Sequence, residues 1–125
     1  MPINSSERIS FIEYKGLRIL YTDFTGLSAE DYLPVLDRAM ELVKLEKEKS
    51  IYTLSRHSQI HISEPLKRKT EEFANVARPY SKGTATTGLT GLQRIIAKSI
   101  KRDIYFADNL EQAKEYLYKL ETERK

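Results

Sequence analysis

A short segment rich in glycine and threonine is the part of this chain best suited to hold an anion. Residues 88–91 (Gly-Leu-Thr-Gly) follow a β-prone run of residues at 84–87 and precede a predicted helix. Backbone N–H groups at the start of a helix can bind a phosphate or carboxylate, and nearby hydroxyl and guanidinium groups add donors. The lysine-containing ending of a P-loop is absent, and the glycines are equally expected if they only permit a tight turn. The residues of this candidate ligand loop are Thr87, Gly88, Thr90, Gly91 and Arg94.

The two histidines, His57 and His61, lie four residues apart, a spacing that would place both on one side of a helix. The segment around them has no helical periodicity, and no nearby Asp or Cys completes a metal-ligand set. As an acid–base pair they also lack a defined nucleophile, although Ser55, Ser58 and Ser63 are close in sequence. We therefore predict no metal site, no cofactor and no enzymatic activity.

Lys98, Lys101 and Arg102 follow Arg94 at spacings that place basic side chains on one face of the predicted helix, opposite Ile95. A basic face beside the glycine turn could dock an acidic protein or an anionic lipid head group. A solvated helix surface explains the same pattern. Both interpretations stay open.

Composition and charge narrow the class of protein. A chain of 125 residues with 40% hydrophobic and 31% charged residues is expected to form a single domain over 1–125, with flexible ends at 1–7 and 121–125. No apolar run approaches the roughly 18 residues of a membrane span, and the amino terminus lacks the apolar core of a secretory signal. There are no cysteines, and a net charge of +3 without aromatic–basic interleaving does not favour nucleic-acid binding. We expect a cytoplasmic protein.

The order of predicted elements indicates an α/β domain. Two β-prone runs, 9–14 and 17–23, flank Lys15-Gly16, a two-residue loop typical of an antiparallel hairpin. Helices and strands then alternate, which favours parallel strands. The predicted order is ββαβαβαβα, a mixed and mostly parallel five-stranded sheet with about four helices. The helices are expected at 28–47, from 63 to just before Pro79, at 92–100 and at 109–120, and the remaining strands at 50–54, 84–87 and 104–107.

Local signals indicate where the helices begin. Ser28 with Asp31 resembles a capping box, and Pro34 predicts a regular start nearer Asp31 or an early kink. Ser63, followed by Glu-Pro, is a good N-cap for the second helix. Asp108 is expected to open the last one, with a glutamate three residues on.

This order and several local sequences resemble the STAS superfamily, in particular its bacterial SpoIIAA-like branch, related to the sporulation anti-sigma-factor antagonists. The similar parts are Asp-Phe-Thr-Gly-Leu at 23–27, the capped first helix, Gly-Leu-Thr-Gly-Leu at 88–92 and Phe-Ala-Asp at 106–108, and the likeness extends over 7–120. The resemblance implies a non-catalytic STAS-like domain that acts in signalling or stress regulation by binding another protein. An anti-sigma-factor-like protein or a kinase would be the partner.

In the antagonists, a serine at the start of the second helix is phosphorylated, which switches partner binding. By this resemblance Ser63 is the candidate phosphorylation site, and Glu64, Lys98, Lys101 and Arg102 are candidate docking residues. A helix amino terminus stabilises a phosphate, whereas the neighbouring Glu64 would repel it. A plain N-cap at Ser63 is the alternative.

A second function of a different class stays open. STAS-like folds are similar in architecture to lipid carriers of the Sec14 type, and apolar helix residues here could flank a pocket. The chain would then carry a small apolar or anionic ligand. The edge strand of the predicted hairpin also leaves homodimerisation open.

Overall fold

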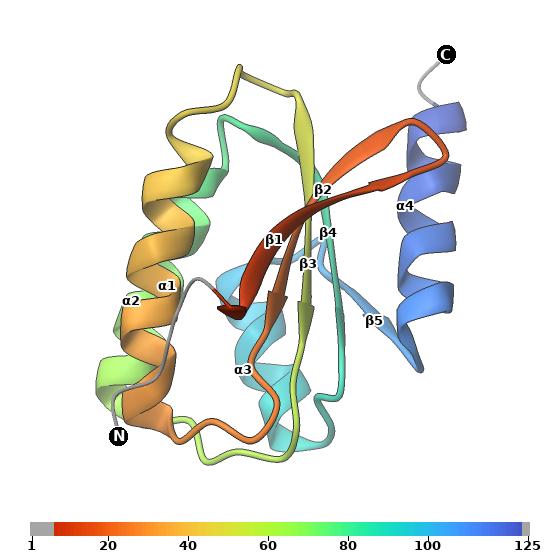
Figure 1. The fold of residues 1–125 in the computed structure, drawn as a ribbon. Coiled ribbons are helices and arrows are strands. Elements are labelled where there is room, and N and C mark those ends of the chain that lie inside the picture. Colours follow the sequence, from red (N-terminus) through yellow and green to blue (C-terminus); the bar gives the residue numbers. More distant parts are fainter. Residues whose placement is uncertain (1–6, 124–125) are drawn as a thin grey trace.

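The computed structural model describes residues 7–123. Within them, nine elements follow the predicted order and form an α/β fold around a five-stranded sheet (Figure 1). The strands are β1 (Ile9–Tyr14), β2 (Leu17–Asp23), β3 (Ile51–Arg56), β4 (Ser81–Thr87) and β5 (Tyr105–Ala107). The helices are α1 (Ala29–Val43), α2 (Glu64–Ala77), α3 (Leu92–Ile100) and α4 (Leu110–Glu123).

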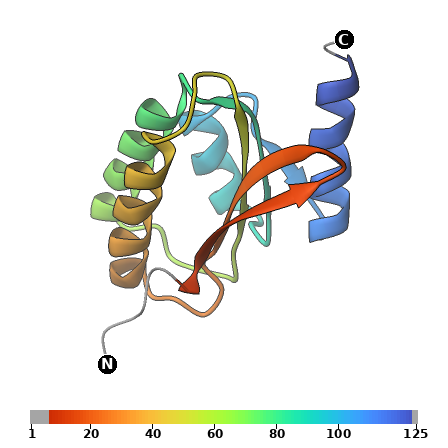
Figure 2. The same cartoon turned by 45° about the horizontal axis from the view of Figure 1, so that its top comes forward.

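The helices cover the two faces of the sheet unequally. The strand order is β1-β2-β3-β4-β5, with β1 antiparallel to β2 and the other neighbours parallel. Because crossovers between parallel strands are right-handed and the order never reverses, α1, α2 and α3 lie on one face. α4 covers the opposite face (Figures 1 and 2). In doubly wound folds, ligands usually bind in the crevice at the point where the strand order reverses. This sheet has no such point.

The amino-terminal hairpin has the predicted tight turn. Lys15 (φ 49°) and Gly16 (φ 86°) both adopt the left-handed conformation, as a type I′ turn requires. Tyr14 therefore pairs directly with Leu17, and the antiparallel register continues to Ile9. The prediction of a hairpin is confirmed.

The first helix has the predicted cap at Ser28 but ends earlier than predicted. α1 begins at Ala29, capped by Ser28, whose Oγ accepts from the backbone N–H of Asp31 at 3.2 Å. The alternative start nearer Asp31 does not occur, because Pro34 is exposed and the helix includes it with the loss of only one intrahelical hydrogen bond. The helix ends at Val43 rather than near 47, since the charged residues that follow offer no apolar face to bury.

The last helix is capped one residue later than predicted and extends further. The side chain of Asn109, not Asp108, accepts from the N–H of Gln112 at 2.8 Å, and the Gln112 side chain accepts from the N–H of Asp108 at 2.6 Å. Residues 121–123, where the predicted fraying begins, belong to α4 in the structure, and their flexibility stays a prediction. The Glu121 carboxylate accepts from the Tyr52 hydroxyl at 2.7 Å, and this contact holds the helix end. The expected flexible residues 1–6 and 124–125 lie outside the described part.

Strand β4 begins at Ser81, three residues before the predicted start. Its first half has weak β-propensity because it contains Lys82-Gly83. A side chain at Gly83 would meet those of Tyr52 and Leu120, so the glycine lets α4 pack closely on the sheet.

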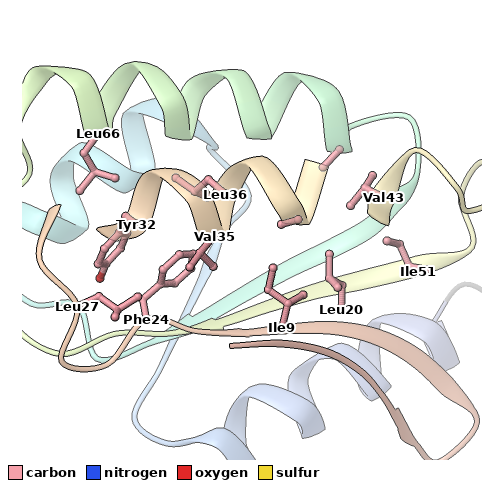
Figure 3. Packing of buried hydrophobic residues seen from close by; sticks show 12 residues of the cluster. Ile9, Leu20, Phe24, Leu27, Tyr32, Val35, Leu36, Val43, Ile51 and Leu66 are labelled. Atoms are coloured by element: carbon pink, nitrogen blue, oxygen red, sulfur yellow. The ribbon is translucent and has the colours of Figure 1, made fainter. Parts of the chain in front are cut away.

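Each face of the sheet has its own hydrophobic cluster. The cluster under α1 and α2 is shown in Figure 3, where Val35 points from α1 toward the sheet beside Phe24, and Val43 lies near Ile51. The cluster under α4 contains Ile19, Tyr52, Leu54 and Leu117, among others. Among the helices of residues 7–123, none combines the length and the apolar composition needed to cross a bilayer.

Candidate ligand site

A cavity of about 140 Å³ lies between the sheet and the three helices on its first face. Strands β2, β3 and β4 supply its floor, and α1, α2 and α3 surround it. The cavity is partly open to solvent. Most of its lining is aliphatic or aromatic, including Leu20, Leu36, Phe73, Ile96 and Ile100.

Hydroxyl side chains on the cavity floor are paired across neighbouring strands. Thr53 and Thr84, which are register partners of β3 and β4, share a hydrogen bond of 2.8 Å between their hydroxyls. Two register positions further along, Ser55 donates to Thr86 at 2.9 Å. Because these hydroxyls satisfy each other, the floor presents a largely apolar surface to the cavity.

The apolar residues of α3 do not form one buried face. Ile96 and Ile100 face the cavity but stay only half-buried. Leu92 and Ile95 are 69% and 68% exposed. Since inward-facing residues of α3 keep contact with open space, this helix spans the cavity instead of filling it.

Local contacts hold α3 at its amino end. The helix starts at Gly91, which provides no side-chain cap, and Gln93 is its buried side chain. The Gln93 amide donates to the carbonyl of Ile60, and its Oε1 accepts from the N–H of Thr90. The amino end of α3 is therefore fastened to the loop between β3 and α2.

At the carboxyl ends of the strands, four side chains form a continuous hydrogen-bonded chain that borders the cavity. The hydroxyl of Tyr32 lies 2.9 Å from Nδ1 of His57, and Nε2 of His57 lies 2.9 Å from Oγ of Ser55. Ser55 in turn contacts Thr86. The four residues come from α1, β3, the loop after β3, and β4.

The direction of each hydrogen bond in this chain can be assigned from its far end. The single hydroxyl proton of Thr86 is donated to the backbone carbonyl of Ser55 at 3.2 Å. The Thr86 oxygen therefore accepts from Ser55, and Ser55 is the donor of that bond. Nε2 of His57 must then donate to Ser55, and Nδ1 accepts from the hydroxyl of Tyr32. A catalytic serine donates its proton to the histidine, whereas here the histidine donates to Ser55. The direction of this hydrogen bond is therefore opposite to that of a serine nucleophile.

Burial keeps this chain uncharged. Protein atoms surround the His57 ring, which stacks on Phe24 with centroids 5.0 Å apart. Burial lowers the pKa of His57 to about 4, and the negative charge of Asp23 opposes that shift. Burial, with a contribution from Asp23, raises the pKa of Tyr32 above its ordinary value. At neutral pH the cavity therefore ends in a neutral, hydrogen-bonded wall.

The predicted ligand loop is packed against this wall. Gly88 (φ 96°) lies so close to the backbone of His57 that a Cβ would collide with its carbonyl. Thr87 is buried, and its carbonyl accepts from the N–H of His57 at 2.8 Å. Thr90 and Gly91 are exposed. These contacts give the loop a structural role, and the anion-binding role stays a prediction.

The basic residues predicted to form one stripe are spread over different surroundings. Arg94 donates to the carbonyl of Leu89 at 2.7 Å and covers the Phe106 ring. Lys101 borders the cavity and pairs with Asp103 at 3.1 Å. Lys98 and Arg102 are exposed.

The predicted switch serine acts as a helix cap. Ser63 accepts from the N–H of Leu66 at 3.3 Å, and Glu64 next to it is exposed. His61 is exposed and takes no part in the chain that contains His57. Among the described residues, no group of three or more His, Asp or Glu side chains is placed to hold a metal ion.

Sequence reasoning did not single out Tyr32 as a site residue, and it found no arrangement that joins Ser55 to His57. The available signal was Ser55-Arg56-His57 at a strand end, where alternation places residues 55 and 57 on one face. No family model matches the chain, and comparisons with curated proteins and with solved structures found no match. The STAS resemblance therefore stays a prediction.

Proposed function

We propose that this chain is a non-catalytic binding domain that takes up a small, largely apolar ligand between its sheet and α1–α3. The observation that carries the proposal is the cavity of about 140 Å³. An engineered apolar cavity of about 150 Å³ stays dry and binds benzene. A cavity of this size costs stability if it has no occupant, at about 24 cal/mol per Å³.

Two features support ligand binding over simple imperfect packing. The hydroxyl groups on the cavity floor already bond to each other, so an apolar occupant above them leaves none of these hydrogen bonds broken. α3 is fastened at its amino end by Gln93, and Ile96 and Ile100 farther along the helix face the cavity, where a guest would contact them. The lining is therefore suited to bind by shape and apolar contact.

The test fills the cavity from α3. Ala97→Leu adds a side chain at a lining position, and Lys98→Leu adds the same side chain at the exposed neighbour. Octan-1-ol is titrated into each ¹⁵N-labelled protein and followed by NMR. We expect saturable shifts at the cavity residues for the unmodified protein and Lys98→Leu, and none for Ala97→Leu. Absence of saturable binding to the unmodified protein would contradict the proposal.

A second candidate function is the regulatory protein-interaction module that the STAS resemblance implies. The observation that favours it is the exposed pair Leu92 and Ile95 on α3. Large apolar side chains that lie together on a surface often mark a contact site. Exposed Lys98 next to them would suit a partner with acidic residues.

This candidate has its own test. Affinity capture from cell extract is compared between the unmodified chain, a Leu92→Ser/Ile95→Ser variant and Leu45→Ser. Leu45 is 79% exposed but lies in the loop after α1, so it controls for general stickiness. A protein lost only with the α3 variant supports docking there, and equal capture by all three contradicts it.

A further inference from the structure

The charged residues that border the cavity all have the same sign. They are Arg78 and Lys101, and among the described residues no carboxylate lines the cavity. Arg78 forms no ion pair with the described residues, and Lys101 pairs with Asp103, whose side chain is 73% exposed. A guest with a negative group would therefore meet two cations and no carboxylate among the lining residues, with the Asp103 carboxylate beside Lys101 but outside the lining.

Both cations lie at the carboxyl ends of helices that border the cavity, away from the edge of the sheet where His57 lies. Arg78 is the C-cap of α2, three residues before β4 begins, and Lys101 is the C-cap of α3. α2 and α3 each start at the carboxyl edge of the sheet and return toward the amino ends of the strands (Figure 1). The neutral chain that contains His57 closes the opposite end.

The cavity is long in the direction of the strands. On β4 its lining runs from Ser81 to Thr86, about 17 Å at 3.3 Å per residue. A lining that extends along the strands in this way fits an unbranched chain better than a compact ring system.

We propose that the ligand is a single-chain carboxylic acid, bound with its carboxylate at Arg78 and Lys101 and its apolar chain extending toward His57. This inference rests on the proposed ligand-binding function. The orientation follows from the two ends of the cavity. A carboxylate beside the saturated His57 chain would lose its hydration and find no free donor, whereas Arg78 offers a fork of N–H donors.

Four probes of matched chemistry test the proposal by isothermal titration calorimetry. Octanoate, octan-1-ol and octylamine share one chain and differ in their polar group, and adamantane-1-carboxylate carries the acid on a bulky body. We expect octanoate to bind at least tenfold more tightly than each of the other three. Raising the salt concentration is expected to reduce this preference.

Charge variants assign the preference to particular residues. The double variant Arg78→Gln/Lys101→Gln is expected to lose the tenfold preference for octanoate while its affinity for octan-1-ol stays unchanged. The control Lys98→Gln/Arg102→Gln removes the same charge from exposed positions and is expected to keep the preference. Cations at helix ends also stabilise their helices, so binding and not stability is the deciding measurement.

The outcomes separate this proposal from the function on which it rests. If octan-1-ol binds as tightly as octanoate, and Ala97→Leu blocks both, the cavity binds ligands and the carboxylate proposal is overturned. Tighter binding of adamantane-1-carboxylate than octanoate overturns the unbranched chain. If none of the four probes binds, the proposed function fails as well.

Discussion

The backbone carbonyl of His57 lies against Gly88, in the space that a Cβ on residue 88 would occupy. This contact joins the end of β4 to the loop after β3. The hydrogen bond from the N–H of His57 to the carbonyl of Thr87 joins the same two segments. The glycine turn that resembles an anion cradle in the sequence thus supports the residue at the end of the cavity.

Replacing Gly88 by alanine should be severely destabilising. The new Cβ would collide with backbone atoms, which cannot rotate away, and the φ of 96° is itself unfavourable for alanine. We expect Gly88→Ala to lower the free energy of unfolding by more than about 3 kcal/mol in urea denaturation followed by circular dichroism. Gly16→Ala, at φ 86° with no atom within 4 Å, should cost only about 1–2 kcal/mol. Equal losses would contradict the role assigned to the contact.

The sequence was sufficient to predict the order of elements, because each element carries a local signal. The Lys15-Gly16 turn, the Ser28 and Ser63 caps and Pro79 after α2 all act over a few residues. The end of α4 could not be predicted, since what holds it there is Tyr52, 69 residues earlier in the chain. Local periodicity contains no information about such a partner.

The candidate site was less predictable for the same reason. Tyr32, Ser55, His57 and Thr86 meet only because β3 and β4 pair in parallel and α1 packs across them. The sequence also contains apolar residues at helical spacings along α3. That spacing does not show that Leu92 is exposed while Ile96 faces a cavity. Such a difference depends on how far the helix stands from the sheet.

The long-range contact between Tyr52 and Glu121 at the end of α4 can be tested by substitution. Glu121→Ala removes the acceptor of the Tyr52 hydroxyl and the carboxylate that Lys82 contacts at 2.9 Å. Tyr52 is fully buried, so we expect a loss of about 1–3 kcal/mol in unfolding free energy. Glu123→Ala, at an exposed position of the last turn, should change it by less than about 0.5 kcal/mol. A similar effect of both substitutions would show that 121–123 are held only weakly.

The assigned direction of the hydrogen-bonded chain predicts the effect of removing one hydroxyl. Tyr32→Phe leaves Nδ1 of His57 without its donor while keeping the ring stacked on Phe24, whose centroid is 4.3 Å away. An unsatisfied buried acceptor should cost about 1–3 kcal/mol in chemical denaturation. Tyr80→Phe is the control, since the Tyr80 hydroxyl makes no hydrogen bond with the described residues. This substitution should leave the free energy of unfolding nearly unchanged. A neutral Tyr32→Phe would argue against the assigned tautomer.

Acid should destabilise the fold through His57. Its pKa is about 4 in the folded protein and about 6.5 in an exposed histidine, so the unfolded chain binds more protons between these values. Stability is therefore complete above about pH 6.5 and falls as the pH drops toward 4. The full difference corresponds to about 3 kcal/mol, at roughly 1.4 kcal/mol per pKa unit.

Histidine variants separate this effect from the titration of carboxylates. Urea unfolding is measured from pH 7 to 4.5, above the range in which Asp23 titrates, since the pKa of Asp23 is lowered by its hydrogen bonds from Thr25 against the opposing effect of burial. We expect His57→Gln to lose most of the pH dependence in this window, even if it is less stable at pH 7. His61→Gln, at an exposed position, should keep the dependence of the unmodified protein. If His57→Gln retains the full slope, the buried neutral histidine is not its source, and the polar wall of the cavity must be protonated differently from the arrangement assigned to it.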